Sequence, residues 1–185
     1  MQDEKLRERL DARTSIYNGH VINLEKWDVT LPNGKPAMRE VAIHKGASAI
    51  VPVDDEGYVY LVRQFRYAVG QHLWEIPAGK REKGENPFVT AQRELNEEVG
   101  AAAARWTELG SIIASPGCYA EVLYLYMAEG LTFSRQHLDE DEFLEVRFFP
   151  FAEAVEKCMS GEIRDGKTVT AVLKARLLQE KTCTL

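Results

Sequence analysis

Three glutamates crowd together near Gly100: Glu94, Glu97 and Glu98 occupy positions i, i+3 and i+4. On a helix, these spacings place the side chains on neighbouring positions of one face, where like charges are destabilising. Two interpretations follow: either the acidic face is solvated, or the carboxylates collect around a cation. Hard divalent cations such as Mg²⁺ bind through a few carboxylates and substrate phosphates, so the second interpretation predicts phosphate chemistry.

The flanking residues predict a helix over residues 86–100. Asn86 is a suitable N-cap, Pro87 suits the first helical position, and Gly100 suits the position just after the helix. Apolar residues spaced by 3, 4 and 4 form one stripe: Phe88, Ala91, Leu95 and Val99. We therefore expect one packed face and a neighbouring acidic face.

Nearby residues favour the interpretation that the carboxylates bind a cation. Arg93 lies four residues before Glu97 and can orient that carboxylate. Gly79 and Gly84 allow the backbone of the preceding loop to approach a bound group, because glycine has no side chain in the way. Glu85 adds a further acid near the start of the helix.

Composition narrows the class of protein. The chain has 185 residues, with 29 acidic and 23 basic side chains and a net charge of −6, so it lacks the basic footprint of a nucleic-acid-binding protein. Its N-terminus has no apolar signal-peptide core, and no run reaches the ~18 apolar residues of a membrane span. The three cysteines are far apart and form no CxxC pair: Cys118, Cys158 and Cys183. We expect a cytoplasmic protein without a nucleic-acid or membrane partner.

The remaining pattern predicts an α+β fold. Alternation of apolar and polar residues from 16 to 45, with a turn at residues 32–34 (Pro-Asn-Gly), indicates a hairpin. Further strands are predicted within residues 47–67, 72–80, 106–117, 121–131 and 138–151, and further helices within 151–162 and 168–181. Strands interspersed with helices in this order indicate a helix–sheet–helix sandwich.

The segment from Gly79 to Gly100 resembles the sequence box of the Nudix hydrolases, G-x5-E-x7-R-E-U-x-E-E-x-G-U, in which U is aliphatic. Gly79 is followed after five residues by Glu85, and after seven more by RELNEEVG, residues 93–100. Every fixed position is present at the correct spacing. The one departure is Ala101 at the last aliphatic position, which removes packing volume and touches no chemistry.

The likeness extends from about Ile16 to the end of the chain. "LPNGKPAMRE", "VRQFR", "WEIPAGK", "LDEDEFLEV", "GEIRDGKT", and a proline sixteen residues after Gly100, resemble the ADP-ribose pyrophosphatase branch of the family. Several of these marks are shared with hydrolases of GDP-mannose and other nucleoside-diphosphate sugars. The resemblance implies a Nudix α/β/α sandwich with a mixed sheet at 46–185. It also implies a small antiparallel β subdomain at 1–45, which exchanges strands in a homodimer.

The resemblance also implies which residues act. Glu94 and Glu98 are the principal ligands of Mg²⁺, or of Mn²⁺ as a substitute, with Glu97 and the Ala78 carbonyl assisting. Arg93 and Glu97 belong to the catalytic set. The base that activates water comes from the acidic loop at 139–142, with Glu140 the best positional match and Glu142 the second candidate. Substrate contacts are expected at His20, Arg39, Glu40, Arg66, Ser115, Pro116, Gly117 and Glu121.

The leading hypothesis from these residues is metal-dependent hydrolysis of ADP-ribose to AMP and ribose 5-phosphate. An enzymatic alternative is hydrolysis of a nucleoside-diphosphate sugar such as GDP-mannose or a UDP-sugar. An alternative of another class is a non-catalytic Nudix domain that senses a nucleotide.

Overall fold

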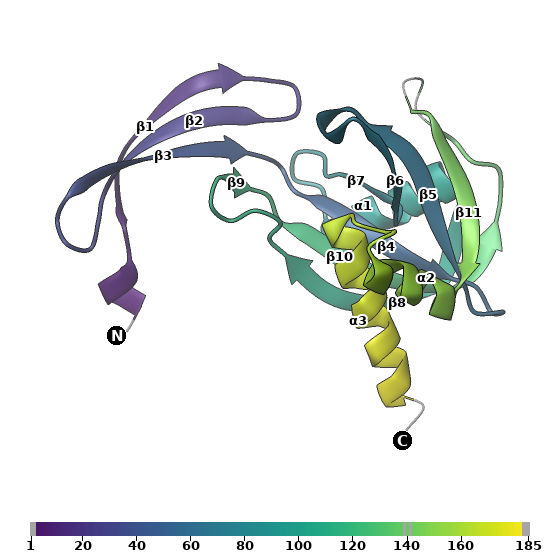
Figure 1. Ribbon diagram of the computed structural model, residues 1–185. Coiled ribbons are helices and arrows are strands. Elements are labelled where there is room, and N and C mark those ends of the chain that lie inside the picture. Colours follow the sequence, from purple (N-terminus) through teal and green to yellow (C-terminus); the bar gives the residue numbers. More distant parts are fainter. Residues whose placement is uncertain (1–2, 139, 141, 183–185) are drawn as a thin grey trace. The chain divides into compact units, whose positions relative to one another are not determined.

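Two β-sheets organise the chain, and each belongs to a separate compact unit (Figure 1). The computed structural model describes residues 3–138, 140 and 142–182. The smaller unit contains the described residues up to Lys45 together with Ile113–Glu121. The larger unit contains Gly46–Ile112 and the described residues from Val122 onward.

The smaller unit is a four-stranded sheet in the order β1-β2-β3-β9. Its strands are β1 (Arg9–Asn18), β2 (Asn23–Thr30), β3 (Pro36–Ile43) and β9 (Tyr119–Ala120), and a short 3₁₀ turn, η1 (Asp3–Leu6), precedes them. The first three strands pair antiparallel, and β9 adds to the edge of β3 in parallel. The predicted hairpin is confirmed, since β2 and β3 flank the Pro-Asn-Gly turn and Gly34 takes a positive φ of 80°.

The larger unit contains a mixed sheet with the strand order β11-β5-β4-β10-β8, to which β6 and β7 add at β5 and β4. Its strands are β4 (Ala47–Val53), β5 (Tyr58–Arg66), β6 (Gln71–Glu75), β7 (Ala78–Lys80), β8 (Ala101–Ile112), β10 (Leu123–Phe133) and β11 (Leu144–Pro150). Strands β4 and β10 pair in parallel, and the other pairs are antiparallel.

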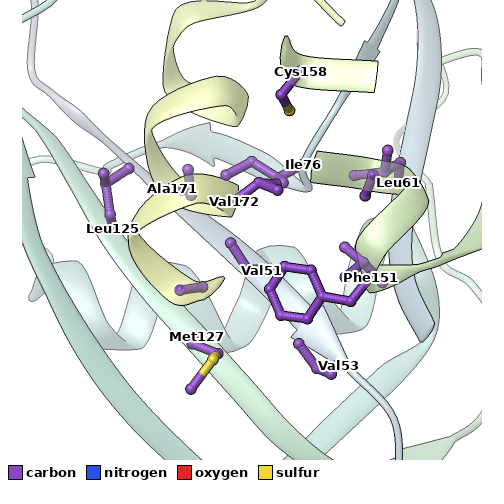
Figure 2. Close-up of a cluster of buried hydrophobic side chains, with 14 of the residues drawn as sticks. Val51, Val53, Leu61, Ile76, Leu125, Met127, Phe151, Cys158, Ala171 and Val172 are labelled. Atoms are coloured by element: carbon purple, nitrogen blue, oxygen red, sulfur yellow. The ribbon is translucent and has the colours of Figure 1, made fainter. Parts of the chain in front are cut away.

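Helices cover both faces of this sheet. They are α1 (Pro87–Glu94), continued by the π-helical turn η3 (Leu95–Val99), then α2 (Phe151–Ser160) and α3 (Gly166–Thr182), with a 3₁₀ turn η2 (Tyr67–Val69) between β5 and β6. One buried cluster joins the sheet to α2 and α3, and Figure 2 shows Val51, Ile76, Phe151 and Val172 within it. A second buried cluster joins the other face to α1 and η3.

The central strand β4 shows why the sequence forms three layers. All of its residues are buried. Val51 packs in the cluster with α2 and α3, whereas its neighbour Ile50 packs in the cluster with α1, because successive side chains point to opposite faces. A strand covered on both faces is mostly apolar rather than alternating, and Ser48, the polar exception in β4, donates its hydroxyl to the Pro87 carbonyl at 2.7 Å. The predicted α+β class and α/β/α layering are confirmed. Within the described residues, no helix combines the length and the apolar character needed to cross a membrane.

Candidate active site

The glutamates lie on α1 and η3, and local sequence fixes both ends of this helical segment. The Asn86 side chain accepts a hydrogen bond from the backbone N–H of Phe88 at 2.9 Å, and Pro87 occupies the first turn. At the other end, Gly100 takes the left-handed conformation with a φ of 68°. The predicted caps are confirmed. The last turn, Leu95–Val99, is a π-helix, a form often found at functional sites.

The acidic face is not solvated. Glu94 is 6% exposed and Glu98 is 2% exposed, whereas the Glu97 side chain keeps 33% of its surface. The apolar stripe fixes this orientation, since Ala91 and Leu95 are fully buried against the sheet. Two carboxylates are therefore taken out of water, which is costly unless another charge compensates them.

Strand β7 lies against these two glutamates. The Ala78 N–H donates to Oε2 of Glu98 at 2.9 Å. A Cβ on Gly79 would lie 1.9 Å from Oε1 of Glu94, so a side chain at this position would push the Glu94 carboxylate out of its place. The glycine that opens the sequence box thus has a steric role in bringing the backbone of β7 onto the glutamate.

Arg93 pairs with three acids, two on the helical segment and one before it. Its Nη1 lies 2.7 Å from Oε1 of Glu94 and donates to Oε2 of Glu97 at 2.8 Å, as expected for the i, i+4 pair. Its Nε lies 3.3 Å from Oε1 of Glu85. Glu98 differs: in the described part of the chain it forms no ion pair with lysine, arginine or histidine, and it accepts a hydrogen bond from the uncharged Ala78 amide.

Burial changes how these acids ionise. It raises the pKa of Glu94 to about 7 and that of Glu98 to about 8, and the charge of Glu142 adds to both increases. In contrast, the Glu82 N–H and the Arg93 guanidinium lower the pKa of Glu85 to about 2. The crowded pair is therefore short of positive charge at neutral pH.

The donor set suits a divalent ion of the Mg²⁺ type. The Glu94 and Glu98 carboxylates, with the carbonyl of Ala78 on the adjacent strand, would supply hard oxygen ligands. Among the described residues, no group of three His, Cys, Asp or Glu side chains is arranged to hold a metal. A site with two carboxylates and one carbonyl is still suitable for Mg²⁺, because this ion usually keeps several waters and binds through one or two carboxylates.

The acidic loop is attached to the end of the glutamate helix. The Ser134 N–H donates to the Gly100 carbonyl at 2.6 Å, and the His137 N–H donates to the Glu97 carbonyl at 3.0 Å. Beyond this attachment, Glu142 is half-buried and its charge acts on Glu94 and Glu98, whereas Glu140 is exposed. Residues 139 and 141 of this predicted loop lie outside the described residues.

Comparison with known proteins assigns the family. The model of the NUDIX domain matches residues 42–172. The chain belongs to the Nudix family. An ADP-ribose pyrophosphatase of Bacillus subtilis (strain 168) is 42% identical over 171 residues, covering 91% of this chain and 92% of the relative. An ADP-ribose pyrophosphatase of Mycobacterium tuberculosis (strain ATCC 25618 / H37Rv) is 37% identical, covering 86% and 78%.

Other relatives carry different names. The methanol dehydrogenase activator of Bacillus methanolicus is 41% identical, covering 91% of this chain and 92% of the relative. A GDP-mannose pyrophosphatase of Salmonella arizonae (strain ATCC BAA-731 / CDC346-86 / RSK2980) is 34% identical, covering 77% and 81%. A crystal structure of an ADP compounds hydrolase superposes with a TM-score of 0.84 at 21% identity, covering 96% of this chain and 97% of that one, which shows the shared fold.

Of the predicted substrate residues, one lies in the larger unit of this Nudix protein. Arg66 ends β5, and its Nε and Nη2 donate to the two oxygens of Glu75 at 2.7 and 2.8 Å. Glu75 is 1% exposed and also pairs with Lys167. Neither Glu75 nor Lys167 was among the functional residues predicted from the sequence. The two residues are 92 positions apart, and no local pattern links them.

The other predicted substrate residues lie in the smaller unit: His20, Arg39, Glu40, Ser115, Pro116, Gly117 and Glu121. Arg39 forms an ion pair with Glu8, and both line a hollow of about 440 Å³ together with Trp27, Pro116 and Gly117. The Ser115 carbonyl accepts from the Tyr119 N–H at 3.0 Å and so closes the turn that carries Pro116 and Gly117.

The remaining three predicted substrate residues are divided between the surface and the interior of the smaller unit. His20 and Glu40 are exposed. The Glu121 carboxylate lies 3.0 Å from Nδ1 of His44, and both side chains are largely buried. His44 was not among the residues predicted from the sequence.

Proposed function

We propose that this Nudix protein hydrolyses the pyrophosphate bond of ADP-ribose and releases AMP and ribose 5-phosphate. The observation that carries the proposal is the buried pair Glu94 and Glu98, which is short of positive charge and belongs to an intact sequence box. Relatives at 42% and 37% identity are named ADP-ribose pyrophosphatases, which supports this substrate.

The proposed metal is Mg²⁺, with Mn²⁺ as a substitute, held by Glu94, Glu98 and the Ala78 carbonyl, and assisted by Glu97. When bound, such an ion neutralises phosphate charge that would otherwise repel a nucleophile. The protein then has to orient its ligands and the substrate. Arg93 holds Glu97, and Arg66 supplies a planar guanidinium of the kind that binds phosphate oxygens in pairs.

A carboxylate of the acidic loop is proposed to accept a proton from the attacking water. Glu140 is the better positional match, but the electrostatic coupling of Glu142 to Glu94 and Glu98 favours Glu142. The two assignments predict different results. If Glu142 is the base, Glu142→Gln should lower kcat far more than the affinity for substrate, and if Glu140 is the base, Glu140→Gln should do so. The assignment fails for whichever residue can be changed without lowering kcat.

Product analysis tests the proposed reaction. Purified protein is incubated with ADP-ribose, GDP-mannose, a UDP-sugar or NADH, each with and without Mg²⁺. Metal-dependent AMP from ADP-ribose supports the proposal. Preferential release of GMP favours the second candidate, for which the 34% identical GDP-mannose pyrophosphatase is the supporting observation. Binding without cleavage would indicate the non-catalytic sensor.

The homodimer with exchanged strands and the cytoplasmic location stay predictions.

A further inference from the structure

A buried ionic cluster in the larger unit surrounds Arg66, and its other members have no role in the reaction as described so far. It consists of Glu75, Arg66, Lys167, Asp165 and Thr168, and we call it the Glu75 cluster. Arg66 engages Glu75 through two parallel hydrogen bonds of 2.7 and 2.8 Å. Lys167 pairs with the same carboxylate, and its Nζ lies 3.0 Å from Oδ2 of Asp165. Glu75 therefore binds two cations at once.

The cluster leaves one side of Arg66 available. A guanidinium has five N–H groups, of which Glu75 takes two, so three remain. Among the described residues, no hydrogen bond uses those three, and the Arg66 side chain is 41% exposed. The two-point contact fixes the plane of the guanidinium, which is the condition for binding an anion without first losing side-chain entropy.

Lys167 is the second cation on Glu75. It shares the carboxylate that holds Arg66, and its Nζ also lies 3.0 Å from Oδ2 of Asp165, so two cations face two carboxylates. Lys167 thereby helps to keep Glu75 ionised as the anchor of Arg66. Burial works to raise the pKa of Glu75, but Arg66 and Lys167 outweigh it and lower that pKa.

Two backbone contacts make the arrangement rigid. The Thr168 hydroxyl accepts from the N–H of Ile76, the residue after Glu75, at 2.9 Å. The Thr168 N–H donates to Oδ2 of Asp165 at 3.0 Å, at the start of α3. The end of β6 and the beginning of α3 are therefore held together around the carboxylate. Arg66 and Glu98 also interact electrostatically, which links the Glu75 cluster to the glutamate pair.

We propose that Glu75 and Lys167 are positioning residues that hold Arg66 in one orientation, with its free N–H groups available to a phosphate oxygen of the substrate. This inference rests on the proposed function, because it needs a pyrophosphate substrate. Neither residue is a metal ligand or a base. Their loss should weaken substrate binding and leave the chemical step nearly intact.

The test is a double-mutant cycle with Lys167→Met and Arg66→Ala, measured as KM and kcat for ADP-ribose at saturating Mg²⁺. Alone, Lys167→Met should raise KM about tenfold, since a hydrogen bond between charged groups is weakened, with kcat changed less than about threefold. In the Arg66→Ala background, the same change should alter KM less than about twofold, because its effect passes through Arg66. Lys167→Arg keeps the charge and should restore most of the affinity.

Lys157→Met is the matched control. Lys157 is also largely buried, at 19% exposure against 12% for Lys167, and it pairs with two acids, Glu153 and Glu162. This control should leave KM unchanged. A KM for Lys167→Met equal to that of the wild type, or an equal increase in the Arg66→Ala background, would overturn the positioning role.

The failure of the proposed function gives a different result. Wild-type protein that neither cleaves nor binds a nucleoside diphosphate would overturn the function, and the positioning role with it. Cleavage of ADP-ribose with an unaffected Lys167→Met variant would overturn the positioning role alone. Glu75→Gln extends the test, provided that this variant unfolds cooperatively, and it should raise KM as Lys167→Met does. If Glu75→Gln does not fold, Lys167→Met and its rescue by Lys167→Arg decide the positioning role.

Discussion

Glu75 and Glu98 are buried to almost the same extent, at 1% and 2% exposure, yet the protein treats them in opposite ways. Glu75 is paired with Arg66 and Lys167, and its pKa is lowered. Glu98 accepts a hydrogen bond from the Ala78 amide, and burial raises its pKa to about 8. Burial alone therefore does not identify a working carboxylate. What identifies it is the missing internal cation, which an external ion can replace.

Glu98→Gln is the most direct test of this difference between Glu75 and Glu98. We expect activity on ADP-ribose to fall by on the order of 10² to 10³-fold or more, because charge compensation at the reacting phosphate is lost. The metal-free variant should fold at least as stably as the wild type, since glutamine can still accept from the Ala78 N–H and carries no buried charge. Steady-state kinetics and thermal unfolding measure both effects.

The exposed strand residue Glu145 gives the control: Glu145→Gln should change neither activity nor stability. A Glu98→Gln variant with near-normal turnover would refute the metal assignment.

The same substitution at the other carboxylate should have the opposite effect on stability. Glu75→Gln leaves two cations around a neutral group, and we expect the free energy of unfolding to fall by about 3 kcal/mol. This is the lower end for breaking a buried pair, because Arg66 remains partly exposed. Urea unfolding at pH 7 measures it. Equal stability changes for Glu75→Gln and Glu98→Gln would remove the distinction between the two sites.

The metal-free protein should lose stability as the pH rises. The folded pKa values of Glu94 and Glu98, about 7 and about 8, lie above the ordinary value of 4.5, so the folded state binds more protons in this range. Stability from these groups is fully present below pH about 4.5 and is lost as the pH rises through 7 to 8, a change of several kcal/mol. Glu75 and Glu85 have lowered pKa values and act in the opposite sense, as the pH falls below their ordinary range.

Unfolding of the wild type in EDTA between pH 5 and 9 measures this slope. The Glu98→Gln variant should show a shallower slope, and an unchanged slope would assign the pH dependence to other groups.

The smallest expected effect is stabilisation by Mg²⁺. At a free concentration ten times its dissociation constant, Mg²⁺ should stabilise the wild type by about 1.4 kcal/mol. Glu98→Gln should reduce this gain, whereas Lys167→Met should retain it, because the Glu75 cluster contains no proposed metal ligand. Thermal unfolding with and without Mg²⁺ makes the comparison, and equal losses in the two variants would contradict it.

The sequence predicted the glutamate helix well because its signals are local. The cap at Asn86, the turn at Gly100 and the apolar stripe through Ala91 and Leu95 all act within a few residues of one another. The same pattern left open whether the acids were solvated, because their burial depends on β7, whose Ala78 and Gly79 reach them through the fold.

The Glu75 cluster could not be predicted in the same way. It joins the end of β6 to the start of α3, and Glu75 and Lys167 are 92 residues apart. A single buried glutamate in "WEIPAGK" has no periodicity that distinguishes it from a surface acid. Its role depends on a partner that only the tertiary structure supplies.

The short strand β9 has a practical consequence for cutting the chain. The polypeptide passes between the two units after Lys45, after Ile112 and after Glu121, and β9 pairs with β3 through Ala42 and Ile43. A protease that cleaves once near Lys45 would leave the N-terminal fragment hydrogen-bonded to a strand that is covalently anchored at both ends. A clone that begins at Gly46 would instead expose the strand edge of Tyr119 to other chains. Nicked protein should therefore remain one particle, while the truncated protein should aggregate.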